Sequence, residues 1–338
     1  MDQTLSQSVP LWLIITIKSV ILLVVVLTTF AYAMLFERKI LGWMQLRPGP
    51  NRVGPWGLLQ PAADAVKMLF KEDLTPNTAD PLIYRLAPFI SVLTAMSVFA
   101  VIPFAEPSGG GWFGSIGDVN AGILFIFALS SIGVYGISLA GWASGSKFPI
   151  IGSVRSTAQM ISYELSMTMS VIGVLILAGS TSLMTIVHQQ ERVWFIVPQI
   201  VGFVIYLITA VAETNRTPFD LVEAETELVG GFHTEYSGLR FGLFFIAEYM
   251  NMISVSCIAT LLFLGGWNPV FGLGFIPGIV WFLAKASLFL FFYIWLRATL
   301  PRLRYDRLMA FGWKVLLPVA TLNLVVTAIV ISFLGGPG

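Results

Sequence analysis

The chain has 338 residues, of which 57% are hydrophobic and only 11% are charged, and its mean hydropathy is +0.84. A soluble globular protein has about a quarter of its residues charged, so this chain cannot cover a water-facing surface and is a polytopic membrane protein. The net charge of +1 argues against nucleic acid as a partner. The single cysteine excludes a disulfide framework, a thiolate zinc site and a cysteine-held iron–sulfur cluster within the chain.

Eight stretches are apolar enough to cross the hydrocarbon core, which takes about 20 residues. They are residues 11–36, 86–105, 119–142, 157–179, 193–212, 241–265, 270–296 and 315–334. Large apolar residues mixed with Gly and Ser, without strand-like alternation, favour helices packed on helices. We therefore predict an all-α polytopic membrane protein with about eight transmembrane helices. The first stretch is long and runs into a charged segment, so we expect no cleavable signal sequence.

The distribution of positive charge predicts the orientation. Sixteen of the 19 Lys and Arg residues lie in the first, third, fifth and seventh connections, and the other connections hold only Arg192. Lys18 and Lys285 lie inside predicted spans. Positive connections stay on the cytoplasmic or matrix side, so both termini are predicted on the periplasmic or intermembrane side.

The chain reads as a single membrane domain, residues 1–338, with three notable positive-side connections at 37–85, 213–240 and 297–314. The first contains an amphipathic stretch, which we expect to lie in the membrane interface as a helix. Its apolar face is Leu59, Ala62, Val66, Leu69 and Phe70, and its charged face is Asp64, Lys67 and Lys71. The last connection is basic, which suits anionic headgroups or a docked partner protein equally well.

Insertion of an ionisable residue into the membrane costs about 2.5–3.5 kcal/mol, so such a residue inside a span points to a structural or functional role. Glu164 and Glu248 are each the eighth residue of their predicted spans, which places both about 10 Å inside the positive face. Glu213 closes the fifth span at that face. Desolvation favours the protonated form of a carboxylic acid and prepares it to exchange protons near neutral pH. The pattern favours a proton path, the alternative being bonds to Arg or backbone of neighbouring helices.

The two intramembrane lysines allow different interpretations. Lys18 lies near the opposite face, where its side chain can snorkel to the headgroups. Lys285 is deeper, and pairing with a carboxylate is one of two open interpretations.

The connection 213–240 is acidic and can be either a solvated surface or a packed functional loop. Apolar Leu221, Val222, Leu228 and Val229 interleave with its acids. A solvated surface does not need these residues, so we expect a packed loop.

The sequence lacks the motifs of several cofactor-binding sites, which limits the chemistry that this chain can carry out alone. His188 and His233, the only histidines, lie in loops on opposite sides, so no span offers the paired axial ligands of a membrane cytochrome b. Gly145-Ser146-Lys147 lacks the residue order and preceding strand of a phosphate loop. Redox or nucleotide chemistry must therefore come from other chains.

The sequence resembles one family of proton-pumping NADH–quinone oxidoreductase (respiratory complex I) subunits, the H-type membrane subunits, which are called subunit 1 in mitochondria. Matching blocks run in order from residue 37 to about residue 306. They include Glu37-Arg38-Lys39, Gly49-Pro50-Asn51, Val53-Gly54-Pro55, Ala63-Asp64, Gly141-Trp142-Ala143-Ser144, Ser162-Tyr163-Glu164, Glu213-Thr214-Asn215-Arg216, Pro218-Phe219-Asp220, Glu235-Tyr236, Ala247-Glu248-Tyr249 and Arg304-Tyr305-Asp306.

The resemblance implies a function as well as a fold. Such a subunit is part of a translocase, docks the peripheral redox arm and forms much of a quinone chamber. The positions matching the chamber and its mouth are Glu37, Arg38, Asp64, Ala65, Phe241, Arg297, Arg302 and Arg304. Those matching an acidic funnel for proton transfer are Glu164, Glu213, Glu223, Glu225, Glu227 and Glu248. Some relatives carry a further glutamate where this chain has Gly133.

The resemblance also implies the ligands, partners and location. Quinone, with ubiquinone as the first candidate, is the substrate, and partner subunits hold FMN and the iron–sulfur clusters, none of them bound by this chain. The partners are the other complex I subunits and the lipid bilayer of a bacterial inner membrane, or alternatively a mitochondrial one. Rival interpretations are a cation–proton antiporter, a subunit of a related ferredoxin-driven complex or membrane hydrogenase, and a purely structural anchor.

Overall fold

A computed structural model describes residues 11–106, 119–220, 230–270 and 275–334, and every regular element in these ranges is helical. The α-helices are α2 (Leu11–Met44), α3 (Gln60–Phe70), α4 (Pro81–Ser97), α5 (Gly122–Ala143), α6 (Lys147–Ala178), α7 (Leu183–Gln189), α8 (Ile200–Glu213), α10 (Gly238–Phe263), α11 (Gly278–Thr299), α12 (Tyr305–Phe311) and α13 (Leu317–Leu334). Short 3-10 turns cover η1 (Pro55–Gly57), η2 (Val98–Ala100) and η3 (Gly231–His233), and a π-helical turn (Gly312–Leu316) joins α12 to α13. Helices satisfy their own backbone polar groups, as hydrocarbon requires.

Seven helices among the described residues are long and apolar enough to cross a membrane, and α8 is a shorter apolar helix. The predicted all-helical, multi-pass architecture is confirmed. The fifth predicted span starts later than expected, at Ile200. The segment before it is held in turns, where Phe195 N–H donates to Gln190 Oε1 (3.2 Å) and Ile196 N–H donates to Phe263 O (3.0 Å). The 14 residues of α8 rise about 21 Å, less than the hydrocarbon core.

Other helices run further than predicted. α2 continues through Glu37 to Met44, and α6 begins at Lys147, ten residues before the predicted span. Glu, Arg and Lys are good helix formers, and Pro149 falls in the first turn of α6, where proline is tolerated. Glu164 is therefore the eighteenth residue of α6 and Glu248 the eleventh of α10. The two acids therefore differ in their place along their helices, whereas their equal depth below the positive face stays a prediction.

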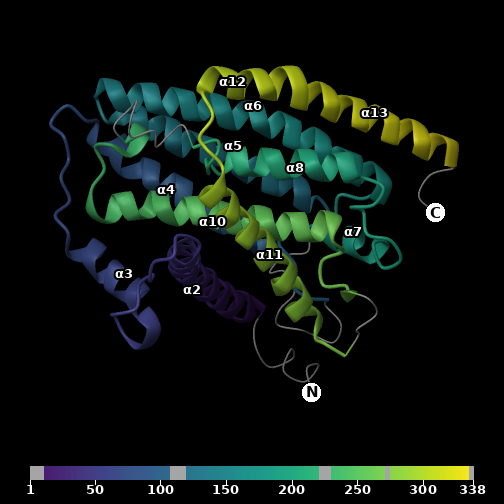
Figure 1. The fold of residues 1–338 in the computed structure, drawn as a ribbon, viewed down its shortest axis with the longest axis horizontal. Helices are drawn as coiled ribbons and strands as arrows, with labels where there is room; N and C mark the ends of the chain where they lie inside the picture. The colour runs from purple at the N-terminus through teal and green to yellow at the C-terminus, as the bar shows by residue number, and fades with distance from the viewer. Residues whose placement is uncertain (1–10, 107–118, 221–229, 271–274, 335–338) are drawn as a thin grey trace.

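The helices form a bundle around α10 (Figure 1). In this view α12 and α13 run along α6 at one edge, and α2 and α3 lie at the opposite edge. α10 is the most buried span, with 61% of its apolar window buried, against 6% for α2. The outward faces of α2 and α13 carry many exposed Val, Leu and Ile side chains, as expected of helices that contact lipid.

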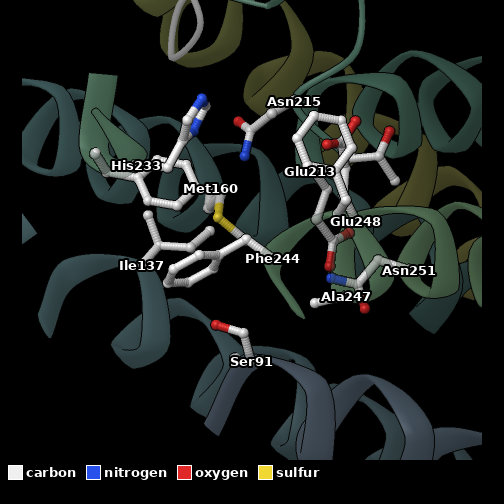
Figure 2. Close-up of a pocket in the computed structure, with 14 residues that line it drawn as sticks. Ser91, Ile137, Met160, Glu213, Asn215, His233, Phe244, Ala247, Glu248 and Asn251 are labelled. Carbon is white, nitrogen blue, oxygen red and sulfur yellow. The ribbon is translucent and has the colours of Figure 1, made fainter. Parts of the chain in front are cut away.

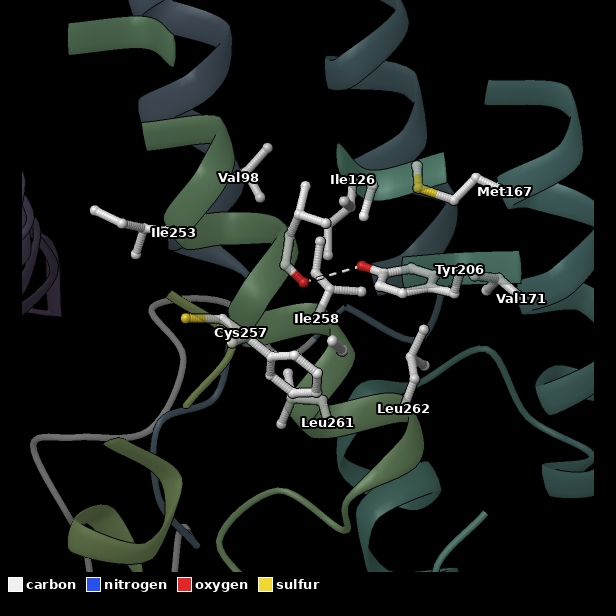
Figure 3. Packing of buried hydrophobic residues seen from close by; sticks show 14 of the residues in the cluster. Val98, Ile126, Met167, Val171, Tyr206, Ile253, Cys257, Ile258, Leu261 and Leu262 are labelled. Carbon is white, nitrogen blue, oxygen red and sulfur yellow. Dashed lines mark hydrogen bonds between the residues drawn. The ribbon is translucent and has the colours of Figure 1, made fainter. Parts of the chain in front are cut away.

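The core lies where α6, α8 and α10 meet (Figure 3). The fully buried ring of Tyr206 reaches across from α8, and its hydroxyl donates to Val255 O of α10 at 3.0 Å. A buried tyrosine hydroxyl needs such a partner. Met167 and Val171 of α6 pack in the same cluster. This packing fixes α8 against α10 and thereby the relative position of the acids that these helices carry.

Lys285 of α11 pairs with no carboxylate of the described residues, so that interpretation of this lysine is wrong. Its Nζ donates to three backbone carbonyls just after α10: Leu264 (2.7 Å), Gly266 (3.0 Å) and Asn268 (2.8 Å). The ammonium also lies 4.6 Å from the centre of the Trp194 ring. Carbonyls at a helix C-terminus lack intrahelical donors, and a cation there is favoured by the helix dipole. Lys285 therefore caps the C-terminal end of α10.

Candidate functional site

Arg216, in the turn that follows α8, joins two carboxylates from different helices. Its Nη1 donates to Glu37 Oε1 of α2 at 2.8 Å, and its Nε lies 2.8 Å from Glu248 Oε1 of α10. Arg297 of α11 donates to the same Glu37 oxygen. The Arg216 guanidinium also lies 4.4 Å from the centre of the Tyr249 ring, a cation–π contact. We call these five residues the Arg216 cluster.

Most of the Arg216 cluster is shielded from solvent, with Glu37 2% and Arg216 6% exposed. Burial alone would lower the pKa of the Arg216 guanidinium, but the carboxylates of Glu248 and Glu37 raise it well above its ordinary value. Arg216 is therefore permanently charged. Arginine suits this place because its planar fork can face two carboxylates at once.

The turn that carries Arg216 is held by one side chain of α6. Gln159 Nε2 donates to the backbone oxygens of Ala212 (2.8 Å) and Phe219 (3.0 Å), and to Asn215 Oδ1 (3.2 Å). Asn215 itself has a φ of 51°, a left-handed conformation that asparagine tolerates better than most residues. The position of Arg216 is thus set by contacts on both sides of it.

The two other carboxylates of the spans accept hydrogen bonds from neighbouring serines of α5. Ser130 donates to Glu213, the last residue of α8, and Ser131 donates to the half-buried Glu164 of α6. The second carboxylate oxygen of Glu213 is buried and has no hydrogen-bond partner among the described residues. A buried acceptor without a protein partner is a natural place for water.

Two small cavities meet at Glu213. One, of about 50 Å³, is lined by Glu213, Glu248, Asn251 and His233 among others (Figure 2). The second, of about 40 Å³, extends past Ser130. Gly133, Glu213 and Asn251 line both. A water molecule needs about 10–15 Å³ of such space and two or more polar partners. Each cavity therefore has room for more than one water beside the carboxylates.

His233 ends η3 and forms part of the wall of the first cavity. Its imidazole contacts the rings of Phe232, Phe241 and Phe245, with centroid distances of 5.0, 5.2 and 6.5 Å. Burial lowers the pKa of His233 to about 4, although the charge of Asp220 opposes this shift. The imidazole is therefore neutral at pH 7.

The backbone of the segment after the acidic loop is anchored on α4. The Tyr84 and Tyr236 rings stack at 4.1 Å, the Tyr84 hydroxyl donates to Glu235 O (2.7 Å), and the Tyr236 hydroxyl donates to Tyr84 O (3.2 Å). Burial raises the pKa of Tyr236 well above its ordinary value, so its phenol remains a donor. Arg240 adds a salt bridge of 2.9 Å to Asp73.

A second charged group links α2 to α3. Arg38 Nη1 lies 2.7 Å from Asp64 Oδ2, and Gln60 Nε2 donates to the other Asp64 oxygen at 3.1 Å. α3 matches the predicted amphipathic helix, with Asp64 on its charged face and Phe70 86% exposed on its apolar face. Ala65 is also exposed on α3. Arg38 and Asp64 are thus brought together, as a pair separate from the Arg216 cluster.

The remaining predicted site residues lie apart from one another. Arg302 lies 3.0 Å from Asp220 and so ties the basic connection to the turn after Arg216. Arg304 forms an exposed pair with Asp306 at 3.6 Å. Phe241 lies beside His233. Glu223, Glu225 and Glu227 lie outside the residues that the structure describes.

Sequence reasoning left out several residues that the structure places at the site: Arg216, Tyr249, Ser130, Ser131, Asn251 and His233. For Arg216 a signal existed, since it is one of only two Lys or Arg residues in the acidic connection and closely follows Glu213. The serines carry no such signal, because small polar residues are ordinary in packed membrane helices. Within the described ranges, no group of three or more His, Cys, Asp or Glu residues could hold a metal ion.

Comparison with known proteins gives a consistent result. The model of a family described as NADH dehydrogenase matches residues 17–328. The H-type NADH-quinone oxidoreductase subunit of Brevibacillus brevis is 52% identical over 99% of both chains. A subunit of the same type and enzyme from Symbiobacterium thermophilum is 53% identical over 95% of this chain and 97% of its own length. The corresponding subunit of Deinococcus deserti is 54% identical over 96% of this chain and 86% of its own.

Proposed function

Because the chain belongs to the family of H-type NADH-quinone oxidoreductase subunits, we propose that it forms the membrane side of a quinone chamber and couples quinone reduction to proton translocation. It is a multi-pass inner-membrane protein that works with the other subunits of that complex. The observation that carries the proposal is the position of Arg216, which contacts Glu37 on one side and Glu248 on the other.

The quinone-binding part comprises Glu37, Arg38, Asp64, Ala65, Phe241, Arg297, Arg302 and Arg304. Most of these residues lie at the ends of α2, α11 and the following segment, or on α3. Ubiquinone is the first candidate, and its reduction takes two electrons and two protons per molecule. The electrons come from FMN and iron–sulfur clusters held by partner subunits. This chain contributes charges and shape rather than redox groups.

The proton-transfer part comprises Glu164, Glu213, Glu223, Glu225, Glu227 and Glu248. Support comes from the two cavities that meet at Glu213 and from the serine hydroxyls of α5 that contact Glu213 and Glu164. Carboxylates linked by hydroxyls and water can pass protons over distances that none of them spans alone.

Arg216 is the coupling residue in this proposal. The Arg216 guanidinium lies 2.8 Å from the Glu248 carboxylate, and the opposite charges attract each other. When reduction of quinone adds negative charge near Glu37 and Arg297, Arg216 is drawn toward that side and Glu248 takes up a proton. In a poorly solvated site such charge movements act strongly, because little water screens them. Reversal of the shift after quinol leaves releases the proton.

Glu164→Gln tests the proton-transfer part in inner-membrane vesicles that contain the whole complex. We expect NADH:quinone reductase activity and proton pumping to fall together, because an amide cannot exchange a proton. NADH oxidation by an artificial acceptor at the flavin should remain at the wild-type level. Glu191→Gln, in an exposed pair with His188, is the matched control. Wild-type quinone-linked turnover in Glu164→Gln contradicts the assignment.

The domain and orientation assignments remain part of the proposal. We propose one membrane domain over residues 1–338, with the connections 37–85, 213–240 and 297–314 facing the redox arm and both termini on the periplasmic side. Copurification supplies the test against a stand-alone antiporter. The chain should elute with the flavin and iron–sulfur subunits rather than alone or as a homodimer.

A further inference from the structure

His233 is a titratable residue of the Glu213–Glu248 cavity that the proposed function does not use. Among the described residues that line this cavity, three can take up or release a proton: Glu213, Glu248 and His233. The two glutamates come from the membrane helices α8 and α10, whereas His233 comes from η3, in the connection between them. Figure 2 shows His233 on the far side of Met160 from both carboxylates.

The backbone holds His233 at this place. η3 lies directly against α6, because a Cβ on Gly152 would come within 2.8 Å of Gly231 Cα. Thr234 Oγ1 donates to Gly231 O (2.7 Å), and Tyr236 N–H donates to His233 O (3.0 Å). The stacked Tyr84 and Tyr236 rings anchor the next turn. The imidazole is thus attached to a fixed support rather than to a free loop.

The surroundings of the imidazole are aromatic on one side and acidic on the other. Phe232, Phe241 and Phe245 cover it, and none of the described residues that α5 and α6 contribute to the cavity is charged. The charged groups that the structure describes around it are Asp220 in the preceding turn and, across the cavity, Glu213 and Glu248. A neutral imidazole has one nitrogen that donates and one that accepts. It can therefore pass a proton without storing one.

We propose that His233 is a proton-transfer residue between the side of its ring that faces Asp220 and the cavity that holds Glu213 and Glu248. One ring nitrogen accepts a proton from a water or carboxylic acid on the Asp220 side. The other nitrogen gives its proton to cavity water or to a cavity carboxylate, and ring reorientation restores the starting tautomer. One proton moves per cycle, with no change in net charge on the ring and no redox step. This inference rests on the proposed function, since it adds a member to that proton path.

The experiment compares His233→Phe, His233→Gln and His233→Ala with Glu248→Gln in vesicles that contain the complete complex. Proton pumping and quinone reduction are measured, and NADH oxidation at the flavin reports assembly. We expect His233→Phe to lower the pumping rate by about a hundredfold, the lower end of what a positioned general acid–base group contributes. His233→Gln keeps polar contacts but cannot relay a proton, so it should show the same loss of pumping. It supplies the test if His233→Phe fails to assemble.

Chemical rescue separates proton transfer from space filling. Added imidazole should restore pumping to His233→Ala, whereas pyrrole, which has the same size but no basic nitrogen, should not. Equal rescue by pyrrole, or wild-type pumping in both His233→Phe and His233→Gln, overturns the inference for His233. The proposed function still stands in that case if Glu248→Gln pumps poorly. Wild-type pumping in Glu248→Gln overturns the proposed function itself, and the proposal for His233 with it.

Discussion

Arg216 and its carboxylates show what a single residue does at the centre of this protein. Removal of the cation in Arg216→Met leaves Glu248 without its charged partner in a poorly solvated site, and a loss of this kind costs about 3–5 kcal/mol. We expect little assembled complex from this variant, measured as flavin-site NADH oxidation in membranes.

Arg216→Lys keeps the charge but not the fork that faces two carboxylates. This variant should assemble, with quinone reductase activity lowered by about tenfold because the acids lose their mutual alignment. Arg192→Met, on an exposed residue of the opposite connection, is the control and should behave as wild type. A fully active Arg216→Met would mean that Glu37 and Glu248 do not depend on this arginine.

The buried imidazole of His233 makes a prediction about pH. Its folded-state pKa of about 4 lies below the value of about 6.5 in an unfolded chain. Between these values the unfolded chain binds a proton that the folded chain does not. The free energy of unfolding is therefore highest above pH 6.5 and decreases as the pH falls toward 4. The melting temperature of the subunit, followed by immunodetection of the soluble complex, should therefore fall more steeply with acidity in wild type than in His233→Gln. Parallel curves would exclude a buried neutral imidazole.

At the scale of elements, the sequence predicts which segments cross the membrane better than where their helices end. Apolar length identifies a span, but α2 and α6 extend into charged residues because a helix does not stop where hydrocarbon stops. α8 is shorter because, before Ile200, the N–H groups of Phe195 and Ile196 donate to Gln190 Oε1 and Phe263 O rather than to helical carbonyls. The charged pairs across α2, α3, α10 and α11 depend on tertiary packing, which no local pattern encodes.

The closure of α10 by Lys285 gives a prediction at the same scale. Lys285→Met leaves three carbonyls without their donor, and each buried unsatisfied group costs about 1–3 kcal/mol. We expect a lower melting temperature and less of the protein in the membrane, with unchanged quinone affinity in the molecules that fold. Lys18→Met on α2 is the matched control. If both variants melt alike, the three hydrogen bonds do not stabilise the bundle.

For the whole molecule, the imbalance of positive charge predicts the orientation, which one introduced cysteine can test. Glu191 is exposed, and the native Cys257 is buried, so a membrane-impermeant thiol reagent should report position 191 alone. We expect Glu191→Cys to react in spheroplasts and to be protected in inside-out vesicles, because the connection before α8 carries almost no positive charge. The reverse pattern would invert the topology.

At the scale of the whole bundle, Gly133 is a position beside both cavities that carries no side chain. An added Cβ there would meet only the Thr94 hydroxyl within 4 Å, at 3.2 Å, and the residue borders both cavities. A single nucleotide change can turn a glycine codon into one for glutamate. With a shift of a few tenths of an ångström at the Thr94 hydroxyl, lineages can gain or lose an acid at this point, and the number of ionisable groups along the route can drift while the scaffold stays the same.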